Sequence, residues 1–207
     1  SLIHLYSEVL QRFRSAAEGK GMTRKPPEHL RQRIATYFDP LPFYYEPLES
    51  HVTDKQRYPL AAVTQRPMAM YHSWDSQNAW LRQIHAHNHL YVNPRVAREA
   101  GIEDGGWMWI ESPWGKVRCM CMYSEAVEPG TVWTWNAIGK APGAWRLSPD
   151  ANESRRGFLL NHVISEELPD AGGTISNSDP VTGQAAWYDV RVRIRPAGEG
   201  EPEETSP

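Results

Sequence analysis

The hydrophobic pattern in the first part of the chain is helical. Residues 8–18 place apolar side chains at helical spacing, Ser7 stands before them as a candidate N-cap, and glycines follow. Residues 28–38 repeat an apolar side chain every four positions directly after Pro26 and Pro27, and proline is tolerated in a first helical turn. The pattern therefore predicts two short helices.

Residues 39–50 interrupt the helical pattern and contain three prolines within nine residues. Because proline restricts its own backbone and that of the preceding residue, this segment predicts an extended connector. We expect the N-terminal helical and extended region, residues 1–56, to end near Gln56.

From residue 57 the apolar side chains alternate with polar ones over short runs, as they do in β-strands. Asn93 as N-cap, Pro94 as first helical residue and Gly101 beyond the end frame one small helix between two runs. The pattern predicts a mainly β domain over residues 57–196, a barrel or a sandwich, followed by a charged, disordered tail over 197–207. The predicted strands cover residues 58–65, 89–94, 107–112, 116–123, 131–136 and 185–196.

Charge and hydropathy exclude two classes of partner. The formal net charge is −3, and Lys and Arg are scattered along the chain, so no basic surface for nucleic acid is expected. No run approaches the roughly 18 apolar residues that a membrane-spanning helix needs, and residues 1–20 carry charges throughout. We expect neither nucleic-acid binding nor direct membrane insertion.

Cys119 and Cys121 stand two residues apart in an alternating run, so both side chains should leave the same face of one strand. A disulfide between them is unfavourable, and a single C-x-C lacks the second pair that a zinc site needs. We interpret both as small packing residues, with a redox or metal role as the alternative.

Two further motifs could carry chemistry. On a strand, His85, His87 and His89 would align three imidazoles as zinc or copper ligands, but no carboxylate or cysteine stands at matching spacing. Ser73, His72 and Asp75 could form a nucleophile-and-base arrangement, but sequence neighbours rarely point at one another, and no G-x-S-x-G motif surrounds the serine. We assign no metal ligand and no catalytic residue to the chain.

The segment TQRPMAMYHSWDSQNAWL, from Thr64 to Leu81, follows a predicted buried strand and concentrates hydroxyls, amides, a guanidinium and aromatic rings. Arg66 can clamp an anion through two N–H groups, while Thr64 and Ser73 can donate to a phosphate or to the edge of a ring. An anionic heterocycle suits this loop, and a solvated loop with an incidental arginine is the alternative. No Walker or G-x-G-x-x-G motif occurs, so a nucleotide would have to be bound by other loops.

Three ordered segments resemble the C-terminal domain of the molybdopterin oxidoreductases, the dimethyl sulfoxide reductase superfamily. YPLAAVTQRPMAMYHSW resembles the first barrel strand and cofactor loop, LYVNPRVAREAGIEDGGWMWIESPWGKVRCMCMYSEAVEPGTVW the strand, helix and hairpin series, and SDPVTGQAAWYDVRVRI the closing segment. The resemblance extends over about nine-tenths of the chain. It implies a six-stranded double-psi β-barrel whose loops bind a bis(molybdopterin guanine dinucleotide) cofactor.

The resemblance also implies a site and partners. A molybdenum or tungsten ion would be ligated from another domain, and an iron–sulfur cluster would lie in a preceding N-terminal part. The implied partners are an iron–sulfur electron-transfer subunit and the remainder of the catalytic subunit. By position, Thr64, Arg66, Met70, Tyr71, His72 and Ser73 would lie against one pterin or its phosphates, with Asn161 and Gln184 approaching from later loops.

The chain begins at Ser1 within an apolar stretch, which we interpret as an internal boundary of a longer protein. We therefore expect the cofactor-binding module of a molybdenum or tungsten oxidoreductase, inactive in isolation. The closing segment most resembles the branch that acts on sulfur oxyanions, with formate and nitrate as alternative substrates. The alternative functions are a small self-contained enzyme on the same barrel and a separate cofactor-binding subunit.

Overall fold

The computed structural model divides the chain into two compact units, residues 1–47 with 177–186 and residues 48–176 with 187–207. The predicted tail lies outside the described residues from position 199 onward. No helix in the described part of the chain is long and apolar enough to cross a membrane. The residues described are 5–21, 24–75, 78–85, 87–136, 138, 157–170, 173–185 and 190–198, without the side chains of Ser73 and Arg82.

The first unit contains the two predicted helices, α1 (Glu8–Ala17) and α2 (Glu28–Tyr37). The Ser7 hydroxyl accepts a hydrogen bond from the Leu10 amide (3.3 Å), so the predicted N-cap is confirmed. Phe13 and Phe38 pack edge to face with ring centroids 5.7 Å apart. Contacts of this kind hold the pair together, since the helices are too short to be stable alone.

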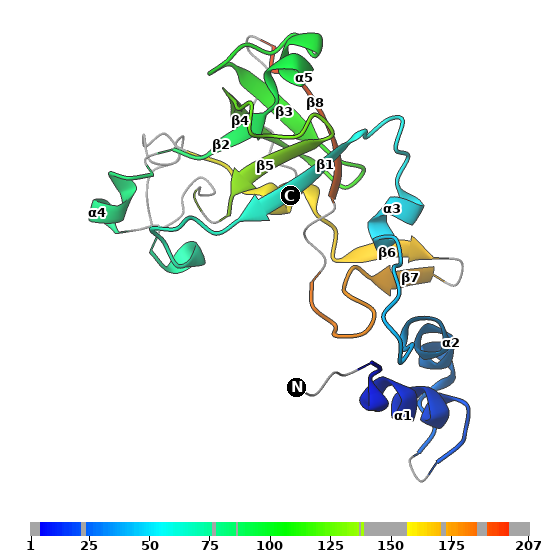
Figure 1. Cartoon of the computed structure of the whole chain (residues 1–207). Coiled ribbons are helices and arrows are strands. Elements are labelled where there is room, and N and C mark those ends of the chain that lie inside the picture. The colour runs from blue at the N-terminus through cyan, green and yellow to red at the C-terminus, as the bar shows by residue number, and fades with distance from the viewer. Residues whose placement is uncertain are drawn as a thin grey trace. The chain divides into compact units, whose positions relative to one another are not determined.

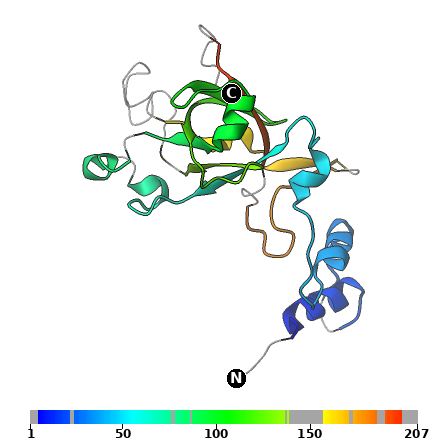
Figure 2. The ribbon, with the colours of Figure 1, turned by 45° about the horizontal axis from the view of Figure 1, so that its top comes forward.

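The second unit is built on a closed six-stranded barrel in the order β1-β5-β2-β4-β3-β8 (Figures 1 and 2). The predicted barrel is therefore confirmed. Two strand pairs are parallel, β1 with β5 and β2 with β4, and the other four pairs are antiparallel. The strands are β1 (Leu60–Gln65), β2 (His89–Val92), β3 (Trp107–Glu111), β4 (Lys116–Tyr123), β5 (Thr131–Trp135) and β8 (Val190–Pro196).

Alternate side chains of the strands fill the interior of the barrel. In β5, Val132 and Thr134 are buried, whereas Trp133 and Trp135 between and after them are only half-buried. In β4, Cys119 and Cys121 point inward together and are both free thiols, which confirms the packing interpretation. Burial raises the pKa of Cys121 to about 12, with the charge of Asp104 adding to the effect.

The end of the predicted connector is helical. It contains α3 (Leu48–Val52), and Glu49 within it is only 3% exposed. The Glu49 carboxylate accepts hydrogen bonds from the Trp114 indole (3.3 Å) and from the Arg191 amide (3.2 Å), both in the second unit. These bonds attach α3 to the barrel unit, which begins at Leu48.

The predicted small helix is confirmed as α5 (Pro94–Glu99), with the Asn93 side chain accepting from the Arg95 amide (3.1 Å) and Gly101 at φ 72°. The remaining elements are too short for a hydrophobic period to show in the sequence. They are η1 (His72–Trp74) and α4 (Ala79–Arg82) between β1 and β2, and η4 (Leu160–Val163), β6 (Glu167–Asp170) and β7 (Gly173–Ser176) between β5 and β8.

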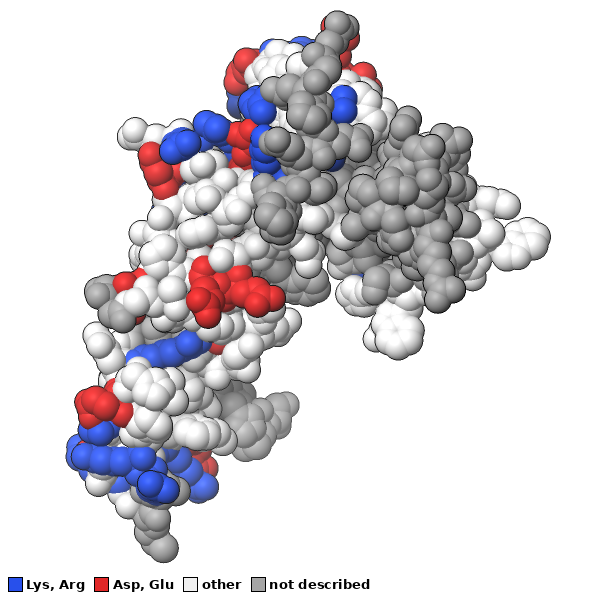
Figure 3. Space-filling view, turned by 180° about the vertical axis from the view of Figure 1, so that it is seen from behind, with Lys and Arg blue, Asp and Glu red and all other residues white. Residues whose placement is uncertain are grey.

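An ion-pair cluster joins the outer faces of β3 and β8. The Glu111 carboxylate, 10% exposed, accepts from Arg193 and Arg195 at 2.7 Å each. Burial alone would raise the pKa of Glu111, but hydrogen bonds from Arg195 and Arg193 outweigh it and lower the pKa. In the upper part of Figure 3, basic and acidic side chains accordingly lie next to one another.

Candidate functional site

The long connections of the barrel leave from one end. β1 and β5 run parallel, with Gln65 opposite Trp135. The other pairs show that β1, β3 and β5 end at this side of the barrel, and that β2, β4 and β8 begin there. In Figure 1, β1 and β5 both point toward the side on which α4 lies. Residues 66–88, 112–115 and 136–189 connect strands at this end, which we call the loop end.

Thr64 and Arg66 mark the point where β1 reaches the loop end. The Thr64 hydroxyl oxygen is buried and has no hydrogen-bond partner among the described residues. Arg66 is exposed, and its guanidinium donates to the Met70 carbonyl at 3.2 Å, which uses one of its five N–H donors. The Met70 side chain is 2% exposed and anchors the loop, so the guanidinium is held in place at the surface.

The next three predicted residues continue this loop. Tyr71 is 62% exposed, and its ring lies edge to face with His72 at a centroid distance of 5.3 Å. His72 has φ 51°, a left-handed conformation that costs free energy in a residue with a Cβ and recurs at functional sites. Ser73 follows in η1, and its side chain lies outside the described part of the chain. Asp75 accepts from the Tyr71 amide (2.8 Å), which closes the turn.

Asn161 belongs to another connection of the same end. It lies exposed in η4, which packs against β4. The His162 carbonyl approaches Gly115, in the turn between β3 and β4, so closely that a Cβ at position 115 would overlap it. The missing side chain of Gly115 therefore allows η4, which contains Asn161, to pack against the turn at the loop end.

Gln184 lies in the other unit. Its carbonyl accepts from the Asp179 amide (2.6 Å) in a loop that also brings the Tyr45 hydroxyl to the Asp179 carboxylate (2.5 Å). Burial alone would raise the pKa of Asp179, but hydrogen bonds from Thr182 and Tyr45 outweigh it and lower the pKa to about 2. The structure thus brings Asn161 to the same barrel end as the Thr64–Ser73 loop and assigns Gln184 to the N-terminal unit.

A polar network that the sequence analysis missed closes the barrel at the loop end. The Thr134 hydroxyl lies 3.0 Å from Asn88 Oδ1 and 2.9 Å from the His89 carbonyl, while the Asn88 amide donates to the carbonyls of Trp135 (3.0 Å) and Phe158 (3.3 Å). The sequence contains one signal for this network, because Thr134 is a polar residue at an inward position of β5. Asn136, one residue beyond Trp135, has a buried side-chain oxygen to which no group in the described ranges of the chain bonds.

The histidine motif does not form a strand face. Only His89 lies in β2, its ring is 6.1 Å from that of His87, and His85 packs against Trp135. Burial lowers the pKa of His89, and the neighbouring His87 lowers it further. Within the described residues, no three histidine, cysteine or acidic side chains are grouped as metal ligands.

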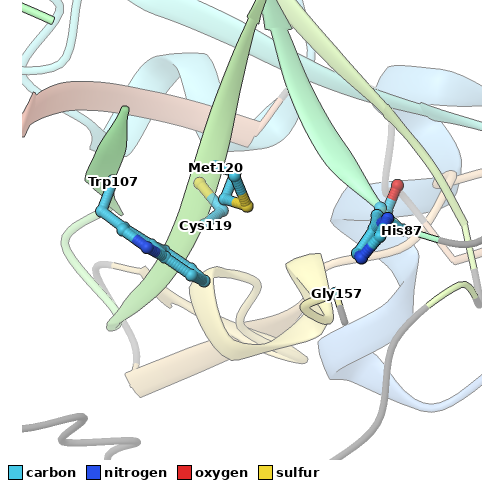
Figure 4. Close-up of a pocket in the computed structure, with 6 residues that line it drawn as sticks. His87, Trp107, Cys119, Met120 and Gly157 are labelled. Carbon is cyan, nitrogen blue, oxygen red and sulfur yellow. The ribbon is translucent and has the colours of Figure 1, made fainter. Parts of the chain in front are cut away.

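A cleft lies between the barrel and the loop that precedes β2. Figure 4 shows Trp107, Cys119 and Met120 from β3 and β4, with His87 and Gly157 across from them. Asn88 completes the lining. The cleft has no room for even a water-sized molecule, so it cannot hold a dinucleotide.

Comparison with known proteins places the barrel in a family. Residues 60–179 match the model of the "Molydopterin dinucleotide binding domain". The chain is 73% identical over 207 residues to a sulfite dehydrogenase polypeptide of Allochromatium vinosum, covering 99% of this chain and 21% of that protein. It is 32% identical over 129 residues to dopamine dehydroxylase of Eggerthella lenta, covering 59% of this chain and 12% of that protein.

The fold has a solved counterpart. The structure of acetylene hydratase from Pelobacter acetylenicus aligns with a TM-score of 0.58 at 22% identity, over 77% of this chain and 22% of that one. The match to residues 60–179 begins at the first residue of β1 and includes the loop after it and η4. The chain thus belongs to the molybdopterin dinucleotide-binding domain family.

Proposed function

We propose that this chain is the C-terminal cofactor-binding module of a molybdenum or tungsten oxidoreductase that oxidises sulfite. The observation that carries the proposal is the combination, at the loop end, of a buried unpaired hydroxyl on Thr64 and a surface guanidinium on Arg66 within the matched residues. The 73% identity to the sulfite dehydrogenase polypeptide favours sulfite over other sulfur oxyanions, formate and nitrate.

The residues at the loop end fit a bis(molybdopterin guanine dinucleotide). An Arg guanidinium binds phosphate oxygens through paired N–H donors, and the N–H groups not used by Met70 suit this role. The unpaired Thr64 oxygen can bond a polar atom of the ligand, and the exposed Tyr71 ring can stack on a heterocycle. We assign His72, Ser73 and Asn161 to the same ligand as weaker contacts.

These groups indicate what the cofactor and this chain would each contribute to the reaction. The bound cofactor, with its metal, supplies the redox chemistry, in which sulfite gains an oxygen from water and releases two electrons and two protons. This chain contributes binding, because Arg66 offsets phosphate charge and Thr64 and Tyr71 orient the pterin. Electrons would leave through an iron–sulfur cluster in the N-terminal part and an iron–sulfur partner subunit.

The test uses the enzyme that contains this chain. Arg66→Ala should reduce cofactor affinity by about 1.5–3 kcal/mol, which is roughly 10- to 150-fold. Arg95→Ala is the matched control, because Arg95 is also exposed but lies on α5, in a connection at the opposite end of the barrel. Pterin content by fluorescence after oxidation, metal content and sulfite-dependent dye reduction are measured together.

Three results would decide against the proposal. A parent enzyme that contains no pterin would disprove cofactor binding, and one that contains pterin but does not oxidise sulfite would disprove the substrate. Equal pterin retention by Arg66→Ala and the parent would remove Arg66 from the site.

A further inference from the structure

Asn136 stands where β5 leaves the barrel at the loop end. Its amide donates to the Gln65 carbonyl (2.8 Å), so the β1–β5 ladder extends one residue beyond Trp135. Val132 and Thr134 occupy alternate inward positions of β5, and Asn136 follows at the same spacing directly after the strand. The side-chain oxygen of Asn136 is buried, and no group in the described part of the chain bonds to it.

Thr64 is the neighbour of Asn136 on the same face. Thr64 pairs in register with Thr134, so Asn136 is two residues further along the adjacent strand. Strand spacing and rise place the two Cα atoms roughly 8 Å apart. Two buried oxygens without partners, Thr64 Oγ1 and Asn136 Oδ1, are thus within reach of a single ligand.

The neighbouring polar groups show that this barrel can satisfy its inward oxygens. Thr134 and Asn88, on the same end, bond to each other and to three backbone carbonyls. A buried polar atom without a partner costs about 1–3 kcal/mol, so the two that remain call for a bonding group from outside the described fold.

The chemistry of the Asn136 side-chain oxygen indicates which kind of ligand group can bond to it. A carboxamide oxygen only accepts hydrogen bonds, and a phosphate oxygen also only accepts, so the two do not bond to each other. An amino or ring N–H of a heterocycle is the complementary donor. We propose that Asn136 accepts a hydrogen bond from the pterin of the cofactor beside Thr64, an inference that rests on the proposed function.

Two substitutions at Asn136 separate this inference from phosphate binding. In the full enzyme, Asn136→Leu removes the acceptor and should lower pterin affinity by about tenfold. Asn136→Asp keeps the acceptor and should retain pterin within about threefold of the parent, because a carboxylate also accepts from N–H. Gln65→Ala, on the exposed outer side of β1, is the control and should retain pterin fully.

Pterin content, measured by fluorescence, is combined with the urea stability of the cofactor-free enzyme. Loss of pterin in Asn136→Leu with unchanged stability supports the inference. If Asn136→Asp loses more pterin than Asn136→Leu, the ligand presents phosphate and the inference is overturned. If both variants retain pterin, or if Asn136→Leu destabilises the cofactor-free protein, the oxygen is bonded within the fold and the inference is also overturned. A parent without pterin would instead overturn the proposed function.

Discussion

Thr64 in β1 and Thr134 in β5 are paired in register on adjacent strands, but their hydroxyls differ in hydrogen bonding. The Thr134 hydroxyl lies within 3.0 Å of two acceptors, whereas the Thr64 hydroxyl is buried and bonds to no group in the described structure. Replacement of each threonine by valine keeps the side chain nearly the same size and removes only the hydroxyl. The pair therefore isolates the free energy of a satisfied and an unsatisfied hydroxyl in one barrel.

The expected effects have different signs. Thr134→Val leaves Asn88 Oδ1 without its hydroxyl donor in a side chain that is 3% exposed, which should cost about 1–3 kcal/mol of unfolding free energy. Thr64→Val removes a buried polar atom that bonds to nothing, so it should be neutral or stabilise the cofactor-free chain by up to about 1 kcal/mol. The unfolding free energies of the two variants should differ by about 1–4 kcal/mol. A chain of this length shifts its Tm by about 2–4 °C per kcal/mol, so the variants should melt about 2–16 °C apart.

Urea unfolding of the cofactor-free chain, followed by tryptophan fluorescence, measures both free energies. The m-value should be unchanged in both variants, because neither substitution alters the surface exposed on unfolding. The reasoning is refuted if Thr64→Val destabilises the chain by more than about 1 kcal/mol, since the hydroxyl would then have a partner in the folded protein.

Three other predictions concern the rest of the molecule. Glu111→Gln should lower the unfolding free energy by about 1–3 kcal/mol. The lowered pKa of Glu111 stabilises the parent above the ordinary value of 4.5, so the parent should lose more stability than the variant as pH falls below that value. The Asp179 carboxylate stabilises its contact with Tyr45 fully above its ordinary pKa of 3.8, and this stabilisation is lost as pH falls to about 2. Asp179→Asn should therefore flatten the pH dependence of the contact, which tyrosine absorbance measures. Cys119 and Cys121 should resist a thiol reagent at pH 8 until urea unfolds the barrel, since burial raises the pKa of both; rapid labelling of native protein would contradict this.

The barrel strands could be predicted because each has its own local signal. The alternation in β4 and β5 shows which side chains point inward, and turns such as the one at Gly115 separate the strands. Helix α3 could not be predicted, because its place in the fold depends on bonds from Glu49 to Trp114 and Arg191, which are far away in the sequence. The order of the strands around the barrel likewise depends on pairings between distant segments.

The candidate site was predictable only in part. The loop after β1 was found because hydroxyl, guanidinium and aromatic groups stand together in sequence, as in Thr64, Arg66 and Tyr71. Asn136 could not be predicted as a candidate, because a single asparagine after a strand has no distinctive pattern. It becomes a candidate only in the structure, where the neighbouring Thr134 and Asn88 are hydrogen-bonded and its own oxygen bonds to no described group.

The two unpaired oxygens link the stability of the barrel to its ligand. Valine at position 64 and leucine at position 136 would serve the cofactor-free fold as well as the oxygens or better, since the oxygens bond to nothing there. Their cost is recovered only when a ligand bonds to them, and a ligand present at about a thousand times its Kd adds about 4 kcal/mol to the unfolding free energy. The loop end is therefore the part of the barrel that cofactor binding should stabilise most, which hydrogen exchange with and without cofactor at Gln65 and Trp135 would detect.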